Sequence, residues 1–153
     1  MRRRGGGETV RRWAPVAAWL LVISSLSSGW FGATQTGYFL LPFVHWLFPS
    51  ASYSELLLLH HLVRKLAHFV EFLVLGTLLY RALDGSGFSP RIALRALVIA
   101  AACAAGDELH QWFVTGRTAS PWDSLIDTSG AAAGLGLLAV RARRLTARAQ
   151  ARS

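Results

Sequence analysis

The segment RKLAHFVEFLVLGTLLYRAL occupies residues 64–83 and combines a long apolar run with ionisable side chains inside it. Residues 66–83, at 1.5 Å rise per helical residue, are long enough to span the roughly 30 Å hydrocarbon core of a bilayer. His68 and Glu71 nevertheless lie inside this run. A carboxylate in hydrocarbon costs a few kcal/mol, so Glu71 is expected to face a protein interior or wet cavity and to have a partner there. The segment therefore predicts a membrane-spanning helix with a polar, functional face.

Composition puts the whole chain in the same class. Hydrophobic residues make up 53% of the 153 positions and charged residues only 16%, which is unusual for a soluble domain of this size. The net charge of +8 suggests a nucleic-acid-binding protein as an alternative. The arginines, however, flank apolar runs and do not line an amphipathic surface, so nucleic acid is excluded as a partner.

Four apolar stretches predict an all-α integral membrane bundle of four transmembrane helices. They cover residues 13–31, 66–83, 92–105 with an extension towards residue 114, and 125–140. The last two are shorter or interrupted, but small and polar residues are tolerated where helices pack on each other instead of on lipid. Gly130 and Gly134 form such a small-xxx-small surface on the fourth stretch.

The distribution of arginines predicts the orientation. Arginines are frequent in residues 1–12 and 141–153, whereas residues 13–63 contain no Lys or Arg. By the positive-inside rule, both termini are cytoplasmic. We therefore expect a multi-pass protein of the cell membrane with a transmembrane domain at residues 13–140 between two basic cytoplasmic tails. The alternative of a cleaved signal peptide is weaker, because no clear cleavage site follows the long first run.

The connection between the first two spans, residues 32–63, is aromatic and is expected to lie in the membrane interface, where Trp and Tyr rings are favoured. Within it, Ser52 and Glu55 have the spacing of a capping box. This spacing predicts a helix that begins near Ser52 and continues into the second span.

The predicted topology collects polar residues from separate segments at the outer face. Asp107 and Glu108, with His68, Glu71 and Asp123, are candidate catalytic acids and bases. A second set is expected to bind a ligand: Arg64, Lys65, His110, Gln111, Arg117 and Asp127. The Asp-Glu and Glu-x-His spacings could also supply ligands to a divalent ion, but spacing alone identifies neither a metal nor a cofactor.

Simpler interpretations exist for several of these residues. Arg64 and Lys65 could anchor the helix at the membrane surface beside an ion pair to Glu71. The acidic cluster could be an exposed helix end, and Asp123 could only cap the helix that it opens.

Three separated blocks of this chain resemble the VanZ-like family. They are RKLAHFVEF at 64–72, DELHQWFVTGR at 107–117, and the set Ser120, Asp123, Asp127 and Gly130. The resemblance implies a small multi-span bacterial membrane protein, in a family named after a member associated with low-level resistance to teicoplanin. Family members typically have Pro at the position of Thr115, and many have Asn at that of Asp127.

Two functions remain open at this stage. The protein could bind or modify a lipid-linked anionic component of the cell envelope, with membrane lipids as its surroundings. Alternatively, it could be a non-catalytic scaffold whose charge network holds the helices together. Transport is less favoured, because the polar residues cluster at one surface and form no path across the bilayer.

Overall fold

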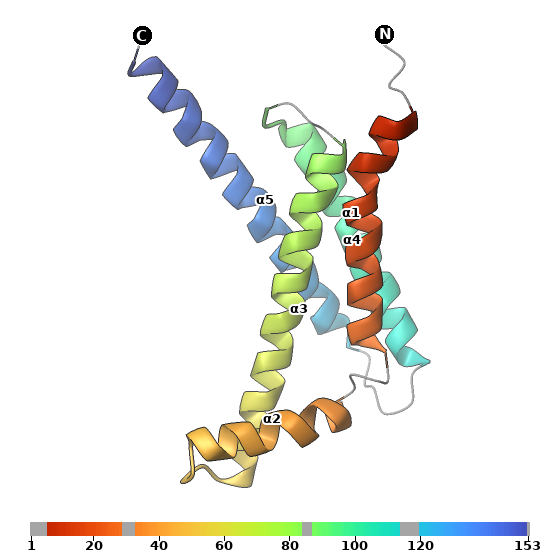
Figure 1. The fold of residues 1–153 in the computed structure, drawn as a ribbon, viewed down its shortest axis with the longest axis vertical. Coiled ribbons are helices and arrows are strands. Elements are labelled where there is room, and N and C mark those ends of the chain that lie inside the picture. The colour runs from red at the N-terminus through yellow and green to blue at the C-terminus, as the bar shows by residue number, and fades with distance from the viewer. Residues whose placement is uncertain (1–5, 29–32, 84–86, 114–119, 153) are drawn as a thin grey trace.

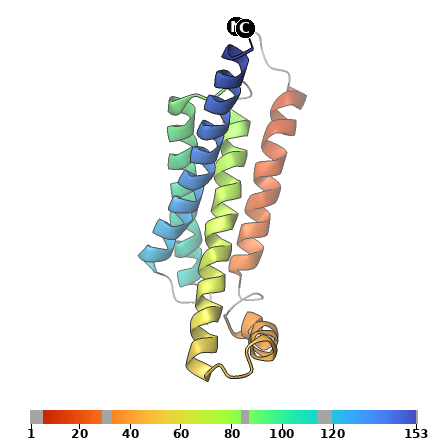
Figure 2. The same ribbon diagram turned by 90° about the vertical axis from the view of Figure 1, so that its left-hand side faces the viewer.

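The computed structural model describes residues 6–28, 33–83, 87–113 and 120–152. Within these ranges the chain forms five α-helices and no strand, which confirms the all-α prediction. The helices are α1 (Gly6–Ser27), α2 (Ala33–Leu47), α3 (Tyr53–Leu83), α4 (Pro90–Trp112) and α5 (Pro121–Gln150). Four of them run along the long axis of the molecule, and α2 lies across one end (Figures 1 and 2).

The start of α3 follows the predicted capping box. The Glu55 carboxylate accepts hydrogen bonds from the backbone N–H and the hydroxyl of Ser52, both at 2.7 Å. In return, the Ser52 hydroxyl accepts a hydrogen bond of 3.4 Å from the Glu55 N–H. Because these groups satisfy the free donors of the first turn, one continuous helix begins at Tyr53 and ends at Leu83.

Helix α3 is the centre of the bundle, since it contacts each of the other four described helices. Its side chains Phe72, Leu75 and Leu79 are almost completely buried. They pack in a core to which the remaining long helices contribute mostly small or branched residues: Val16, Ile23, Ala96, Ala100, Ala104, Ala131 and Leu135. The alanines of α4 recur every four residues and therefore present one small-residue face to the core.

Glycines bring α3 and α5 into backbone contact. A Cβ atom added at Gly130 would overlap the carbonyl oxygen of Phe69, and one added at Gly134 would overlap that of Leu73. On α3, a Cβ atom at Gly76 would lie 2.8 Å from a carbonyl oxygen of α5. The small-xxx-small prediction is confirmed, and the close approach fixes how the polar residues of the two helices face each other.

A tyrosine fixes the other end of α3 against the start of α4. The Tyr80 hydroxyl donates a hydrogen bond of 2.8 Å to the Gly87 carbonyl and accepts one of 2.7 Å from the Ser89 N–H. The Tyr80 ring stacks on Phe88 with a centroid separation of 5.5 Å. Ser89 then precedes Pro90, which begins α4 with the backbone angle that a first helical turn needs.

Two of the described helices, α3 and α5, are long and apolar enough to cross a membrane. Helices α1 and α4 do not meet the same criterion of composition, and α4 has arginines in its first turns and carboxylates in its last. The arrangement with four spans therefore stays a prediction. Helix α5 continues to Gln150, so most of the segment expected as a basic tail is helical.

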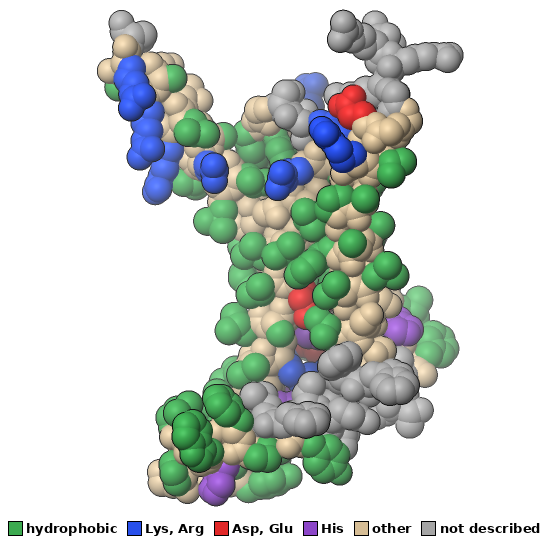
Figure 3. Space-filling model, in the orientation of Figure 1, with side chains coloured by type: hydrophobic (Ala, Val, Ile, Leu, Met, Phe, Trp, Pro, Cys, Tyr) green, Lys and Arg blue, Asp and Glu red, His purple; other side chains and the backbone are tan. Residues whose placement is uncertain are grey.

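The start of α1 and the end of α5 lie at the end of the bundle opposite α2 (Figure 1). Lys and Arg side chains gather at this end, whereas the middle of the molecule presents mainly apolar side chains (Figure 3). The second half of α5, which carries Arg141, Arg144 and Arg148, diverges from the other helices. We call this part of the molecule the basic end.

Candidate functional site

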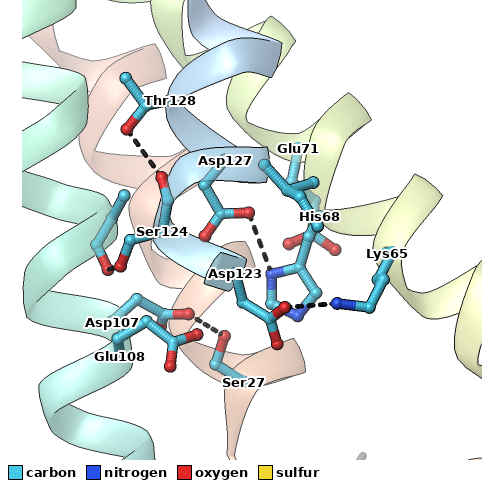
Figure 4. Close-up of polar contacts among 12 residues, drawn as sticks. Ser27, Lys65, His68, Glu71, Asp107, Glu108, Asp123, Ser124, Asp127 and Thr128 are labelled. Carbon is cyan, nitrogen blue, oxygen red and sulfur yellow. Dashed lines mark hydrogen bonds and ion pairs between the residues drawn. The ribbon is translucent and has the colours of Figure 1, made fainter. Parts of the chain in front are cut away.

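The polar residues meet where α4 ends and α5 begins, away from the basic end (Figures 1 and 4). In the close-up, side chains from α3, α4 and α5 point toward one another, and Ser27 of α1 approaches from below (Figure 4). We define the polar cluster as the six residues Lys65, His68, Asp107, Glu108, Asp123 and Asp127.

An ion pair joins α3 to the first turn of α5. The Lys65 ammonium lies 2.6 Å from a carboxylate oxygen of Asp123, and both side chains are partly exposed. Arg64 is partly buried beside them and interacts electrostatically with Asp123 and Glu108. Lys65 therefore pairs across helices and not with Glu71 on its own helix. Ser120 occupies the N-cap position of α5 without a side-chain capping bond. Asp123 lies in the first turn of α5, and its carboxylate pairs with Lys65.

One turn deeper, His68 faces Asp127. The His68 Nδ1 atom is 3.5 Å from Oδ1 of Asp127, whose side chain is completely buried. Neither carboxylate oxygen of Asp127 has a hydrogen-bond partner among the residues that the structure describes. His68 also interacts electrostatically with Glu71 and Asp107, so several acidic groups surround one imidazole.

The Asp107 carboxylate is oriented by two neutral donors. Oδ2 of Asp107 accepts a hydrogen bond of 2.7 Å from the Ser27 hydroxyl and one of 2.9 Å from the Gln111 side-chain amide. Ser27 and Gln111 are both buried. These contacts tie the end of α1 to α4 and hold the carboxylate in one orientation.

Glu108 connects α4 to the start of α5. One of its carboxylate oxygens accepts a hydrogen bond of 2.7 Å from the Ser120 N–H. The other oxygen has no hydrogen-bond partner in the described part of the chain, although the side chain is only 7% exposed. Glu108 is thus a buried acid with one oxygen available for a proton or a ligand.

An open groove of about 270 Å³ lies beside the polar cluster, between α1, α3 and α4. Its walls are mainly apolar and include Leu20, Ile23 and Phe72. Asp107 and His110 supply polar groups to the same groove. Asp107 therefore belongs to both the groove and the polar cluster.

The sequence profile of the VanZ/LLP1 family matches residues 13–142, which is most of the chain. The chain belongs to the VanZ/LLP1 family. No curated protein and no solved structure matches it. The VanZ family is membrane-associated and linked to teicoplanin resistance, so this chain is a VanZ-like protein of that group.

Six of the eleven predicted site residues of this VanZ/LLP1 chain form the polar cluster. Arg64 and Gln111 interact with cluster residues from outside it, and the remaining three lie elsewhere. His110 is exposed and faces the groove. Glu71 lies deeper, and its backbone carbonyl accepts a hydrogen bond of 2.8 Å from the Trp19 indole. Arg117 falls outside the described residues, so its role as a counter-charge stays a prediction.

Ser27 is the main residue of this VanZ/LLP1 site that sequence reasoning missed. It is one of several serines near the end of the first apolar run. Nothing in its spacing distinguishes it from Ser25, whose hydroxyl bonds to the backbone of its own helix. Its role depends on how α1 packs against α4, which a single sequence does not reveal.

Proposed function

We propose that this VanZ/LLP1 protein binds the anionic head group of a lipid-linked cell-envelope component at the outer face of the membrane. The observation that carries the proposal is the position of the polar cluster. The exposed Lys65 of the cluster and the partly buried Arg64 beside it supply two cations. Glu108 supplies a buried acid, and the adjoining apolar groove shares Asp107. A lipid-linked precursor has the matching chemistry, an anionic head group on an apolar chain.

The distribution of side chains supports a bundle embedded in lipid. Large apolar side chains are exposed on all four long helices, for example Leu21 on α1, Leu66 on α3, Val98 on α4 and Leu137 on α5. In water such a surface would favour aggregation, whereas in a bilayer it faces acyl chains. Four crossings agree with the start of α1 and the end of α5 lying at one arginine-rich end, which would be cytoplasmic.

Each part of the site has a role in this proposal. Lys65 is nearly half exposed, so its ammonium can exchange Asp123 for a phosphate oxygen. Arg64 adds a guanidinium that can bind phosphate with two donors. Glu108, which has one oxygen without a hydrogen-bond partner among the described residues, is the group best placed to accept or donate a proton if the bound component is also modified.

A structural role for the same charges is the second candidate. The Lys65–Asp123 ion pair and the Ser27–Asp107 hydrogen bond each connect two helices. A scaffold that presents α2 to a partner would need these connections and no ligand. The two functions predict different outcomes for a substitution that removes the charge of a side chain but keeps the shape of that side chain.

The deciding experiment uses a teicoplanin-sensitive bacterial host that produces the full chain. We would compare the wild type with Glu108→Gln, and use Glu55→Gln as the matched control, because Glu55 is exposed and only caps α3. Membrane abundance is measured for each variant. The proposal expects raised tolerance with the wild type and the control, and loss of tolerance with abundant Glu108→Gln protein.

Binding is measured separately in lipid nanodiscs with and without a polyprenyl phosphate. Preferential binding that Arg64→Gln weakens would support the head-group site. Equal binding of wild type and variant would argue against it. Variants that disappear from the membrane would favour the scaffold instead.

A further inference from the structure

One imidazole and two carboxylates from three different helices converge in the polar cluster. His68 of α3, Asp107 of α4 and Asp127 of α5 each offer one ligand atom, and these atoms all lie within 4.8 Å of one another. We propose that they bind a divalent transition-metal cation such as Zn²⁺. The site goes beyond head-group binding and does not depend on it.

The burial of Asp127 is the observation that demands a partner. Its side chain is 0% exposed, and neither carboxylate oxygen has a hydrogen-bond partner among the described residues. A buried charge without compensation costs several kcal/mol, and such groups are usually paired or coordinate metals. The buried Nδ1 atom of His68 also lacks a hydrogen-bond partner in the described ranges, and it lies 3.5 Å from Asp127.

The distances fit a metal without a rearrangement of the helices. Ligands at 2.0–2.2 Å from a tetrahedral Zn²⁺ are separated by roughly 3.4 Å, close to the distance between His68 and Asp127. No separation in the group exceeds 4.8 Å, so a pair of ligand atoms would have to approach by at most about 1.4 Å when the ion binds. One nitrogen and two oxygen ligands suit Zn²⁺ or Mn²⁺ better than Ca²⁺ or Mg²⁺, which prefer oxygen alone.

The surroundings hold the three ligands in place. Ser27 and Gln111 both donate hydrogen bonds to Oδ2 of Asp107, in the way that outer-shell donors orient metal ligands. The backbone contact of Gly130 with Phe69 fixes α5 against α3, and with it Asp127 against His68. Three protein ligands leave a coordination position open for water or an anionic oxygen.

The competing interpretation is an ion pair between a protonated His68 and Asp127. It needs no metal and would use the same two residues. Titration of the purified protein with Zn²⁺ separates the two, since an ion pair alone predicts no stoichiometric Zn²⁺ site.

The experiment uses the full chain without a histidine tag, purified in detergent and stripped of metal with a chelator. Bound zinc is measured by elemental analysis after gel filtration, and affinity by calorimetry with ZnCl₂. We expect a single high-affinity ion per chain. Asp127→Asn and His68→Gln should each weaken binding by roughly a hundredfold, and Ser27→Ala, an outer-shell change, by about tenfold.

Asp123→Asn is the matched control, because Asp123 lies on the same helix four residues from Asp127 but pairs with Lys65. It should bind Zn²⁺ like the wild type. Absence of a stoichiometric ion in the wild type would overturn the proposal. Equal losses in Asp123→Asn and Asp127→Asn would do the same, as they would indicate a general effect of negative charge.

Thermal unfolding keeps the test valid if a variant is poorly produced. Zn²⁺ should raise the Tm of the wild type and of Asp123→Asn but not that of Asp127→Asn. A Zn²⁺-dependent rise in both Asp127→Asn and His68→Gln would contradict the assigned ligands. No lipid is present in these measurements, so their outcome is separate from that of the head-group experiment.

Discussion

The two ends of the helix bundle carry charge in different ways. At the basic end, Arg141, Arg144 and Arg148 are exposed on a part of α5 that diverges from the other helices. In the polar cluster, charged groups from different helices lie within contact distance and are partly or fully buried. Charge at the basic end needs only a solvated surface, whereas charge in the polar cluster depends on how closely the helices pack.

The largest effect is expected from a substitution that pushes α3 and α5 apart beneath the polar cluster. Gly130→Ala places a Cβ atom against the Phe69 carbonyl. Since overpacking costs about 1–3 kcal/mol, and more where backbone is involved, we expect a large loss of thermal stability in detergent and low membrane abundance. Gly136→Ala is the control, because a Cβ atom there meets nothing within 4 Å. Equal stability of the two variants would mean that the contact between α3 and α5 is looser than described.

A smaller effect is expected where one hydrogen bond in the polar region is removed. Ser27→Ala leaves Oδ2 of Asp107 with one donor fewer and should lower the free energy of unfolding by about 1–2 kcal/mol. Ser25→Ala removes an exposed hydroxyl of the same helix and should change it very little. Chemical denaturation of both variants in the same detergent gives the comparison, and a similar loss in each would remove Ser27 from the site.

The Lys65–Asp123 ion pair is expected to contribute less, because both side chains reach solvent. A double-mutant cycle with Lys65→Met and Asp123→Asn should give a coupling energy of about 0.2–1 kcal/mol. Salt should weaken it, since exposed charges are screened. A coupling well above this range, insensitive to salt, would place the pair in a drier environment than its exposure indicates.

The smallest effect is expected at the basic end. Replacing Arg141, Arg144 and Arg148 together with Gln should change the free energy of unfolding by only about 0.5 kcal/mol, because exposed substitutions away from packed contacts are nearly neutral. Thermal unfolding of the triple variant tests this. A marked loss of stability would show that the diverging half of α5 contributes to the fold.

Local signals predicted much of the fold. The capping spacing of Ser52 and Glu55 located the start of α3, and the four-residue spacing of Gly130 and Gly134 predicted a close helix contact. These features depend on neighbours in sequence. The sequence did not reveal that α5 continues to Gln150, because the charged end of the chain was interpreted as a basic tail. Arginine and alanine, which are frequent there, both favour helix.

The partners within the site were harder to predict. Helical periodicity places Arg64, His68 and Glu71 on one face, which suggested an ion pair within α3. Lys65 pairs with Asp123 instead, because the distance between helices and their rotation decide which acid is within reach. The packing of the helices likewise explains why Asp107 accepts a hydrogen bond from Ser27, a residue far away in sequence.

The Tyr80 hydroxyl of α3, which bonds to Gly87 and Ser89 just before α4, has a consequence at the other end of the molecule. From residue 80 to residue 65 a straight helix extends for roughly 22 Å. A tilt of α3 by about 3° at Tyr80 would therefore displace Lys65 by roughly 1 Å. The hydrogen bonds of Tyr80 at one end of α3 and the backbone contact between Phe69 and Gly130 nearer the other both limit such a tilt, so both help to hold Lys65 beside Asp123.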